Sequence, residues 1–205
     1  LAKKKAVTIM GPRQVGKSTL AYSIIPKDAK VLEINGDNTD VQTMFVNVDE
    51  AKMKILIGNN NFLFVDEAQK IENVGNMLKI VAEKFKDVKI IVTGSSAFKL
   101  AEAVNESLTG RKREFKLYPL SFKEMADDTS VLEESRMIDH RLIYGYYPEV
   151  VTSIGDEKEV LEELIDSYLY KDVMEENNIA KPDKLVKLVQ ALAFQIGSTV
   201  SATEL

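Results

Sequence analysis

Residues 6–20 read AVTIMGPRQVGKSTL, and this stretch decides which fold the chain adopts. Its first five residues form an apolar, partly β-branched run that is typical of a buried strand, and Gly11 ends the run. Residues 11–18 then match G-x-x-x-x-G-K-[ST], and a segment that can propagate a helix follows. In a strand–loop–helix arrangement of this kind, backbone N–H groups and the positive end of the helix dipole face a bound anion. The stretch therefore predicts a loop that binds phosphate groups.

The same residues predict a site for a nucleoside triphosphate with Mg²⁺. Lys17 is expected to reach the β- and γ-phosphates, and the Ser18 hydroxyl is expected to bind the metal ion. The residues expected to surround the phosphates are Gly11, Pro12, Arg13, Gln14, Val15, Gly16, Lys17, Ser18 and Thr19.

Apolar runs and helical periodicity alternate over the first 120 residues. The expected strands are residues 6–10, 31–35, 62–65, 88–93 and 115–118, and the expected helices after the loop are residues 47–57, 71–85 and 97–105. This alternation predicts βαβ units and an α/β fold with a mostly parallel sheet. After Ser121 the pattern is helical, with helices expected at residues 130–144, 157–174 and 182–196 and a further helix beginning at Ser201.

The composition narrows the class of protein. A net charge of −5 argues against a broad basic surface for nucleic acid. The absence of cysteine excludes disulfides and cysteine-bound metal centres, and a cytoplasmic location is expected. The single histidine, His140, gives no basis for a Ser–His–Asp triad or a histidine metal cluster. No apolar run approaches the roughly 18 residues of a membrane span, so no membrane association is expected.

Asp66 and Glu67 directly follow the apolar run of residues 62–65. A carboxylate at the end of such a strand supports Mg²⁺ in P-loop proteins, so Asp66 and Ser18 form the predicted metal site. Glu67 can reach a water in line with the γ-phosphate and act as its general base. The alternative is an acidic pair that merely suits the positive end of the following helix. A hydrolase needs a residue such as Glu67, whereas a nucleotide kinase does not.

Two more residues are candidates for the chemistry. Ser95 lies in the TGSS stretch that ends the strand at residues 88–93, where a hydroxyl can hydrogen-bond the γ-phosphate or the attacking water. Glycine and serine are also ordinary loop residues, which is the alternative interpretation. Arg111 precedes the fifth expected strand, where an arginine can project into a neighbour's site as a finger. The alternative for Arg111 is a basic surface residue.

Five motifs, in their order and spacing, carry a resemblance to a known family: GPRQVGKST, FLFVDEAQK, VTGSSA, LTGRKREFKLYPLSFKE and GYYPEV. With them the chain resembles, over nearly its whole length, the prokaryotic AAA+-superfamily ATPases often described only as "predicted ATPase". The resemblance implies a three-layer AAA+ core in which residues 11–19 are Walker A and residues 62–67 are Walker B. It also implies that Ser95 or Ser96 is the sensor-1 residue and that Arg111 is the arginine finger. It identifies no clear sensor-2 arginine, for which Arg141 is only a weak candidate.

The resemblance further implies a division of the chain into three parts. Residues 1–120 are expected to be the P-loop ATPase core, residues 121–182 a helical lid, and residues 183–205 the start of a winged-helix-like domain. Members of the family usually continue into a C-terminal domain of unknown function. Because the chain begins at Leu1, directly before the first strand, and ends at Leu205, we expect it to be a piece of a longer protein.

The expected function is hydrolysis of MgATP to ADP and phosphate, coupled to a conformational change on an unknown client. The alternative is a nucleotide-gated DNA-binding regulator or scaffold in which turnover is incidental. A GTPase switch is disfavoured because no [NT]-K-x-D tetrapeptide occurs, and a nucleotide kinase because of Glu67. The expected partners are ATP and ADP, further copies of the chain, and DNA through the winged-helix part.

Overall fold

The computed structural model of the chain describes residues 6–95, 107–166 and 182–201. The chain divides into two compact units, Leu1–Val131 and Leu132–Leu205. The first unit is an α/β structure, and the described elements of the second are helices. Every helix in the described ranges is too short or too polar to span a lipid bilayer.

Five strands of the described residues form one parallel sheet in the order β2-β3-β4-β1-β5. The strands are β1 (Ala6–Met10), β2 (Val31–Asn35), β3 (Phe62–Asp66), β4 (Lys89–Gly94) and β5 (Lys112–Lys116). This architecture confirms the α/β fold with a parallel sheet that the sequence predicts. Because all strands run the same way, their carboxyl ends lie along one edge of the sheet, and β1, β3 and β4 are neighbours there.

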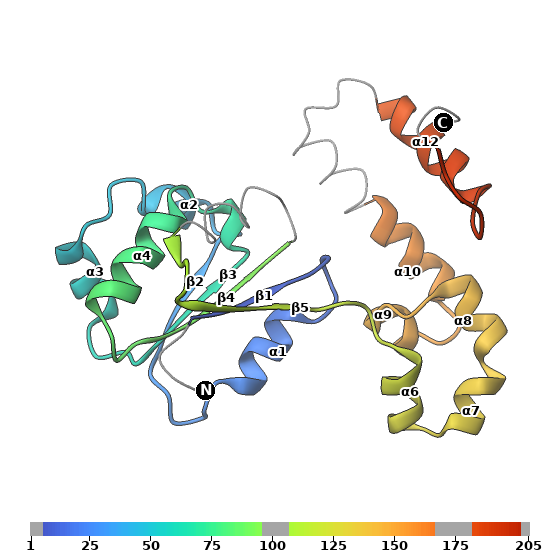
Figure 1. Ribbon diagram of the computed structural model, residues 1–205, viewed down its shortest axis with the longest axis horizontal. Helices are drawn as coiled ribbons and strands as arrows, with labels where there is room; N and C mark the ends of the chain where they lie inside the picture. The colour runs from blue at the N-terminus through green and yellow to red at the C-terminus, as the bar shows by residue number, and fades with distance from the viewer. Residues whose placement is uncertain (1–5, 96–106, 167–181, 202–205) are drawn as a thin grey trace. The chain divides into compact units, whose positions relative to one another are not determined.

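Helices cover both faces of this sheet (Figure 1), as a parallel sheet requires. The helix that follows β1 lies on one face, and the helices that follow β2 and β3 lie on the other. The helical elements of the first unit are α1 (Lys17–Ile24), α2 (Thr39–Met44), α3 (Glu50–Ile57), the 3₁₀ helix η1 (Ala68–Lys70), α4 (Val74–Lys84) and α6 (Phe122–Asp128).

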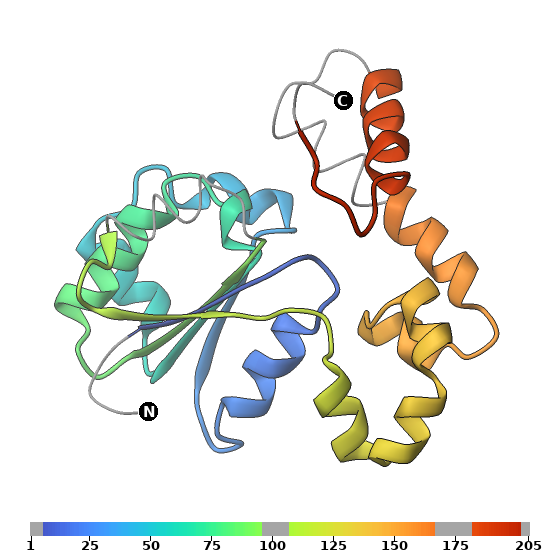
Figure 2. The same cartoon turned by 45° about the vertical axis from the view of Figure 1, so that its right-hand side comes forward.

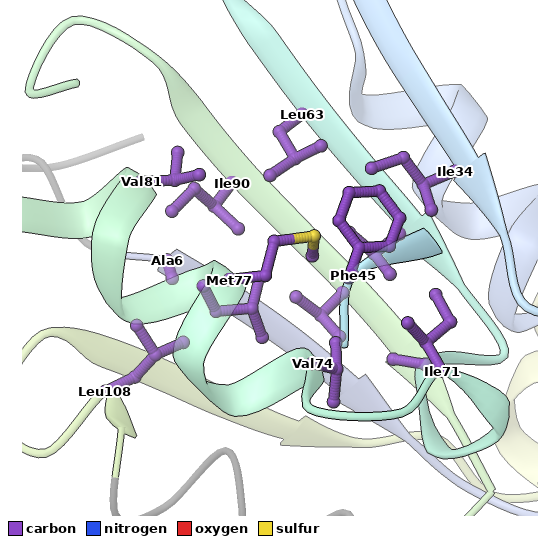
Figure 3. Close-up of a cluster of buried hydrophobic side chains, with 14 of the residues drawn as sticks. Ala6, Ile34, Phe45, Leu63, Ile71, Val74, Met77, Val81, Ile90 and Leu108 are labelled. Atoms are coloured by element: carbon purple, nitrogen blue, oxygen red, sulfur yellow. The ribbon is translucent and has the colours of Figure 1, made fainter. Parts of the chain in front are cut away.

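Strand β3 belongs to both hydrophobic cores because successive side chains of a strand point to opposite faces. Leu63 and Val65 lie in the larger core with α3 and α4 (Figure 3), whereas Phe62 and Phe64 lie in the smaller core with α1. Leu63, Phe64 and Val65 are fully buried. The continuous apolar run in the sequence is therefore explained by a strand that is covered on both sides.

Strand β5 begins three residues and ends two residues earlier than the sequence predicts, at Lys112–Lys116 instead of residues 115–118. Its register with β1 runs from Ala6 opposite Lys112 to Met10 opposite Lys116. Within the described residues β5 pairs only with β1, and its side chains are largely exposed, so hydrophobicity does not mark its limits. Hydrogen bonding to the backbone of β1 determines where β5 begins and ends, and the pattern of apolar residues does not reveal its start.

The helices of the first unit also differ in part from expectation. The segment 71–85 begins one turn late, as α4 at Val74, because Asn73 adopts a left-handed conformation with φ 58°. The short helices α2 and α6 were not expected, although α6 has a capping box between Ser121 and Glu124. The helix expected at residues 97–105 lies outside the described residues.

The second unit contains α8 (Ile138–Tyr144), α9 (Pro148–Thr152), α10 (Glu157–Leu164) and α12 (Pro182–Ala193), and α7 (Val131–Arg136) begins at the boundary (Figure 2). The helix expected at 130–144 is divided into α7 and α8 at Met137. Of the helix expected at 157–174, α10 ends at Leu164, and residues 167–174 lie outside the described residues. The helix expected from Ser201 lies almost wholly outside them as well.

In the described part of the second unit, an ion pair and a histidine–carboxylate contact join helices. The Arg141 Nε donates to Glu134 Oε1 at 3.0 Å, and both side chains are buried. His140 Nε2 lies 3.3 Å from Glu157 Oε1. Arg141, the sensor-2 candidate, is thus held by a carboxylate of its own unit.

The core predicts a sharp difference between two methionines. Met77 of α4 is fully buried, whereas Met44 of α2 is 39% exposed. Met77→Ala is expected to lower the free energy of unfolding by about 2–5 kcal/mol, because it removes buried contacts and leaves a cavity. Met44→Ala, the matched control, is expected to cost less than about 1 kcal/mol. Urea denaturation followed by circular dichroism measures both; equal losses would contradict the core described above.

Candidate functional site

The loop between β1 and α1 has the backbone geometry of an anion-binding nest. Gln14 and Gly16 have left-handed conformations, with φ of 58° and 90°. Gly16 is the N-cap of α1, and its carbonyl accepts from Leu20 N at 2.9 Å, which starts the helix directly after the loop. Left-handed residues next to right-handed ones turn successive N–H groups toward the same side. The second glycine of the motif is therefore required by its backbone angle.

Lys17 is buried at the start of α1, with 4% of its surface exposed. Its Nζ donates to the Pro12 carbonyl at 2.8 Å and lies 3.9 Å from Glu67 Oε1. A buried ammonium group requires such partners because an isolated charge away from water is very unfavourable. The lysine is thus held across the loop, beside the carboxylate at the end of β3.

Asp66 connects three elements at the carboxyl edge of the sheet. Ser18 Oγ, on α1, lies 3.0 and 2.8 Å from the two carboxylate oxygens of Asp66 and donates to them. The Thr93 hydroxyl, on β4, also donates to Asp66 Oδ1. The two residues of the predicted metal site therefore lie in direct contact.

Thr93 is the residue that sequence reasoning missed. It lies in the TGSS stretch but was not selected, because the sequence does not tell which hydroxyl faces Asp66. In the sheet β3 and β4 are neighbours, with Val65 opposite Val92, so the next residue of β4 lies beside Asp66. Thr93 is fully buried. The signal that could have identified it is strand register.

Glu67 follows Asp66 in a left-handed conformation, with φ 46° and ψ 46°. Its side chain is 15% exposed, and its Oε2 accepts from the Gln69 Nε2. Its Oε1 is the oxygen that faces Lys17. The structure thus brings together Lys17, Ser18, Asp66 and Glu67, which the sequence selected from two segments far apart.

Ser95 directly follows β4 and is half-buried. The end of β4 lies beside the start of the phosphate loop, because Gly11 N donates to the Gly94 carbonyl at 3.3 Å. This contact places Ser95 near the loop, and its role stays a prediction. The alternative sensor-1 residue, Ser96, lies outside the described residues.

The other residues of the loop differ in exposure. Val15 is buried, Pro12 and Arg13 are half-buried, and Gln14 and Thr19 are exposed. A nest binds its anion with backbone N–H groups, so the side chains of the loop are free to differ in exposure.

Arg111 lies where the strands of the sheet begin, whereas the phosphate loop lies where they end. Its carbonyl accepts from Ala6 N at 2.8 Å, at the amino end of β1, whereas the loop follows the carboxyl end of β1. Its Nη1 donates to Glu83 Oε1 at 2.7 Å, and the two side chains are 49% and 36% exposed. This hydrogen bond is the main reason why the pKa of Glu83 lies below its usual value. Arg111 is thus separate from the other predicted site residues of its own chain.

The donor set fits Mg²⁺ held largely by a nucleotide. Among the residues that the structure describes, no three His, Cys, Asp or Glu side chains gather into a metal cluster. Ser18 and Asp66 offer hydroxyl and carboxylate oxygens, which are the hard ligands that Mg²⁺ prefers. Mg²⁺ commonly takes one or two protein oxygens and completes its shell with phosphate and water. These two residues would hold the ion in that way.

Residues 3–126 match a family described as AAA domain. Residues 135–205 match a family described as a domain of unknown function. The first match contains β1 to β5 and every residue assigned above to the phosphate site.

Two curated relatives are themselves uncharacterized proteins. One, from Methanocaldococcus jannaschii, is 29% identical over an alignment of 197 residues that covers 87% of this chain and 44% of the relative. The other, from Haemophilus influenzae, is 29% identical over an alignment of 149 residues that covers 70% of this chain and 37% of the relative. The chain thus spans less than half the length of either relative.

The position of Lys17 predicts a loss of binding when its charge is removed. Lys17→Ala is expected to weaken the binding of a fluorescent ATP analogue by about 1.5–3 kcal/mol, or roughly ten- to a hundredfold, because a charge-assisted contact is lost. Fluorescence titration measures the Kd. Lys27→Ala, at an exposed lysine shortly after α1, is the control and should leave the Kd unchanged. Equal affinities for both variants would mean that Lys17 does not contact the phosphates.

Proposed function

The chain belongs to the AAA domain family, and from this membership and the geometry of the phosphate site we propose that it hydrolyses MgATP to ADP and phosphate. AAA domains are nucleotide-binding and ATPase-like. The proposal goes further, because it names the hydrolytic step and the residues that perform it. We further propose that the reaction drives a conformational change on a client. The matches to this chain cover 44% and 37% of the two relatives.

In this proposal each site residue has a separate task. The loop N–H groups and Lys17 bind the phosphates, and Lys17 exchanges the Pro12 carbonyl for phosphate oxygens when it does so. Ser18 and Asp66 would hold Mg²⁺, which when bound would neutralise negative charge on the phosphate oxygens. Thr93 fixes the Asp66 carboxylate by its hydrogen bond. Glu67 accepts a proton from the water that attacks the γ-phosphate, and Ser95 hydrogen-bonds the γ-phosphate or that water.

The observation that carries the proposal is the position of the Glu67 carboxylate. It lies 3.9 Å from the phosphate lysine and belongs to the residue directly after the metal-site aspartate. A carboxylate that served only as a helix cap would accept a backbone N–H of the next helix, but η1 has no side-chain cap hydrogen bond at Glu67. The side chain faces the phosphate lysine instead.

Replacement of Glu67 by glutamine is expected to separate binding from hydrolysis. Glu67→Gln keeps the side-chain shape but removes the base, so turnover should fall by roughly 10²–10⁴-fold while MgATP still binds. Phosphate release measures turnover, and the fluorescent analogue measures binding. Glu72→Gln, at an exposed glutamate between η1 and α4, is the matched control. Wild-type turnover in Glu67→Gln would refute the role of Glu67 as general base.

The phosphate-release assay also distinguishes the hydrolase from the alternative function, a nucleotide-gated DNA-binding regulator or scaffold. Turnover by the wild-type chain is measured with and without duplex DNA. A rate that is measurable without DNA supports the hydrolase, whereas binding of ATP with negligible turnover and a change in DNA affinity supports the alternative.

We also propose that Arg111 acts on the site of a neighbouring copy of the chain. Its position at the far edge of the sheet supports this proposal, because it separates the guanidinium from the phosphate loop of its own chain. An arginine supplied by a second molecule stabilises charge on the transferring phosphoryl group and can raise the rate by about 10³–10⁵-fold. Such a contact joins unlike surfaces, so it closes into a ring or continues as a filament.

Arg111→Ala is expected to abolish the dependence of specific activity on protein concentration. The wild-type chain should gain specific activity as concentration rises, because more sites receive an arginine from a neighbour. ATP affinity of the variant should stay near normal. Mixing Arg111→Ala with Glu67→Gln should restore part of the activity, since one copy supplies the carboxylate and the other the arginine.

Glu83→Gln and Arg113→Ala are the controls for Arg111. If Arg111 matters only through its pair with Glu83, loss of either partner should have the same effect. If Arg111 acts on a neighbour, Glu83→Gln should retain activity because the guanidinium remains. Arg113→Ala tests the exposed arginine within β5 itself. Activity that is independent of concentration, with an inactive mixture, would refute the proposal.

A further inference from the structure

The backbone at Glu67 is held in an unusual conformation. Its φ of 46° and ψ of 46° lie in the left-handed region, which a residue with a side chain rarely adopts. The Glu67 carbonyl accepts from Lys70 N at 3.0 Å, which closes the 3₁₀ turn η1. Such a conformation persists only when the surrounding structure fixes it.

The end of β2 provides this fixation. Gly36 N donates to the Asp66 carbonyl at 2.9 Å, and a Cβ at Gly36 would lie 2.3 Å from the Glu67 carbonyl oxygen. Only glycine allows this close approach. Asp37, the residue after Gly36, forms an ion pair with Lys70 Nζ. The backbone of residues 66–70 is thus fastened to residues 36–37.

A fixed backbone does not fix the carboxylate. Rotation about the last side-chain bond of glutamate is soft, so either oxygen could face Lys17. In the structure the two oxygens have different partners: Oε2 accepts from Gln69 Nε2, and Oε1 lies 3.9 Å from Lys17 Nζ. The hydrogen bond from Gln69 is therefore what selects the orientation of the carboxylate.

The orientation of the Gln69 amide follows from this contact. Its other atom, Oε1, is buried and has no hydrogen-bond partner among the described residues. Turning the amide over would bring that oxygen against the Glu67 carboxylate, and two acceptors repel each other. The glutamine thus leaves an acceptor without a partner in order to donate to Glu67, which is unfavourable unless the contact itself matters.

From these contacts we propose that Gln69 is a positioning residue for hydrolysis: its amide holds Glu67 Oε2 so that Oε1 faces Lys17 and the phosphates. The inference rests on the proposed function, because it concerns the base of that reaction. Gln69 acts through Glu67 and not through nucleotide binding. Its loss should therefore lower kcat and leave the affinity for MgATP unchanged.

The first experiment is a double-mutant cycle in the full chain. Gln69→Met keeps the length of the side chain and removes the donor, and it should lower kcat about 10–100-fold with the Kd for a fluorescent ATP analogue unchanged. In the Glu67→Gln background the same substitution should cause no further loss, since the group it positions is gone. Gln190→Met is the control, because Gln190 is an exposed glutamine of α12 in the second unit. It should keep kcat within about twofold.

The split between kcat and binding separates positioning from a purely structural role. A loosened turn would also disturb the carboxylate that faces Lys17, and it would therefore weaken the binding of the ATP analogue. Loss of the Gln69 donor alone should lower kcat and leave the Kd unchanged. If Gln69→Met keeps wild-type kcat, or its loss is the same with and without the Glu67 carboxylate, the proposal is wrong.

A readout independent of turnover distinguishes this proposal from the proposed function. The side-chain N–H resonances of Gln69, followed by NMR, should shift in Glu67→Gln relative to the wild-type chain, because the acceptor of one N–H changes from a carboxylate to an amide. A wild-type chain that does not hydrolyse ATP would refute the proposed function and with it the role of Gln69 in catalysis, whatever NMR shows. Hydrolysis by a wild-type chain whose Gln69 resonances are unchanged by Glu67→Gln would refute the contact while leaving the proposed function intact.

Discussion

The carboxylate of Asp66 is the acceptor on which the geometry of the site depends. A carboxylate only accepts hydrogen bonds and has room for several, so it can bind donors from different elements at once. Ser18 approaches it from α1 and Thr93 from β4, so the phosphate loop and two strands meet at one group. The parallel sheet makes this meeting possible, because β1, β3 and β4 are neighbours that end at the same edge. Lys17 and Glu67, the chain neighbours of Ser18 and Asp66, approach each other to 3.9 Å.

Burial explains why the polar groups lie at that edge. The central strands are covered on both faces, and the larger core alone unites residues from β1, β2, β3 and β4 with α3 and α4 (Figure 3). A charged side chain in the middle of such a strand would be taken out of water without partners, which is very unfavourable. At the strand ends, loop N–H groups, hydroxyl groups and solvent are available. The reactive groups are therefore confined to the ends, where a ligand can reach them.

The two arginines considered for roles in the site are held very differently. Arg111 pairs with Glu83 where both side chains are substantially exposed, so water and salt screen the pair and it can exchange partners at small cost. Arg141 pairs with Glu134 where both side chains are buried, and its guanidinium lies over the Tyr146 ring. Removing one partner of a buried pair leaves an uncompensated charge. Arg111 is thus the less firmly held of the two arginines, and Arg141 stabilises its own unit.

The sequence by itself determined the phosphate loop, the α/β class and the pair Asp66–Glu67, because each depends on local chemistry: a glycine at a left-handed position, an unbroken apolar strand, and acidic residues directly after it. It did not determine the limits of β5, the division of the helix at residues 130–144, or the roles of Thr93 and Gln69 in holding the two carboxylates. Those follow from strand register, from a break in the helical backbone at Met137, and from the hydrogen bond between Gln69 and Glu67. Only the tertiary structure decides them, because they depend on which backbone lies beside which, and residue type alone carries no such information.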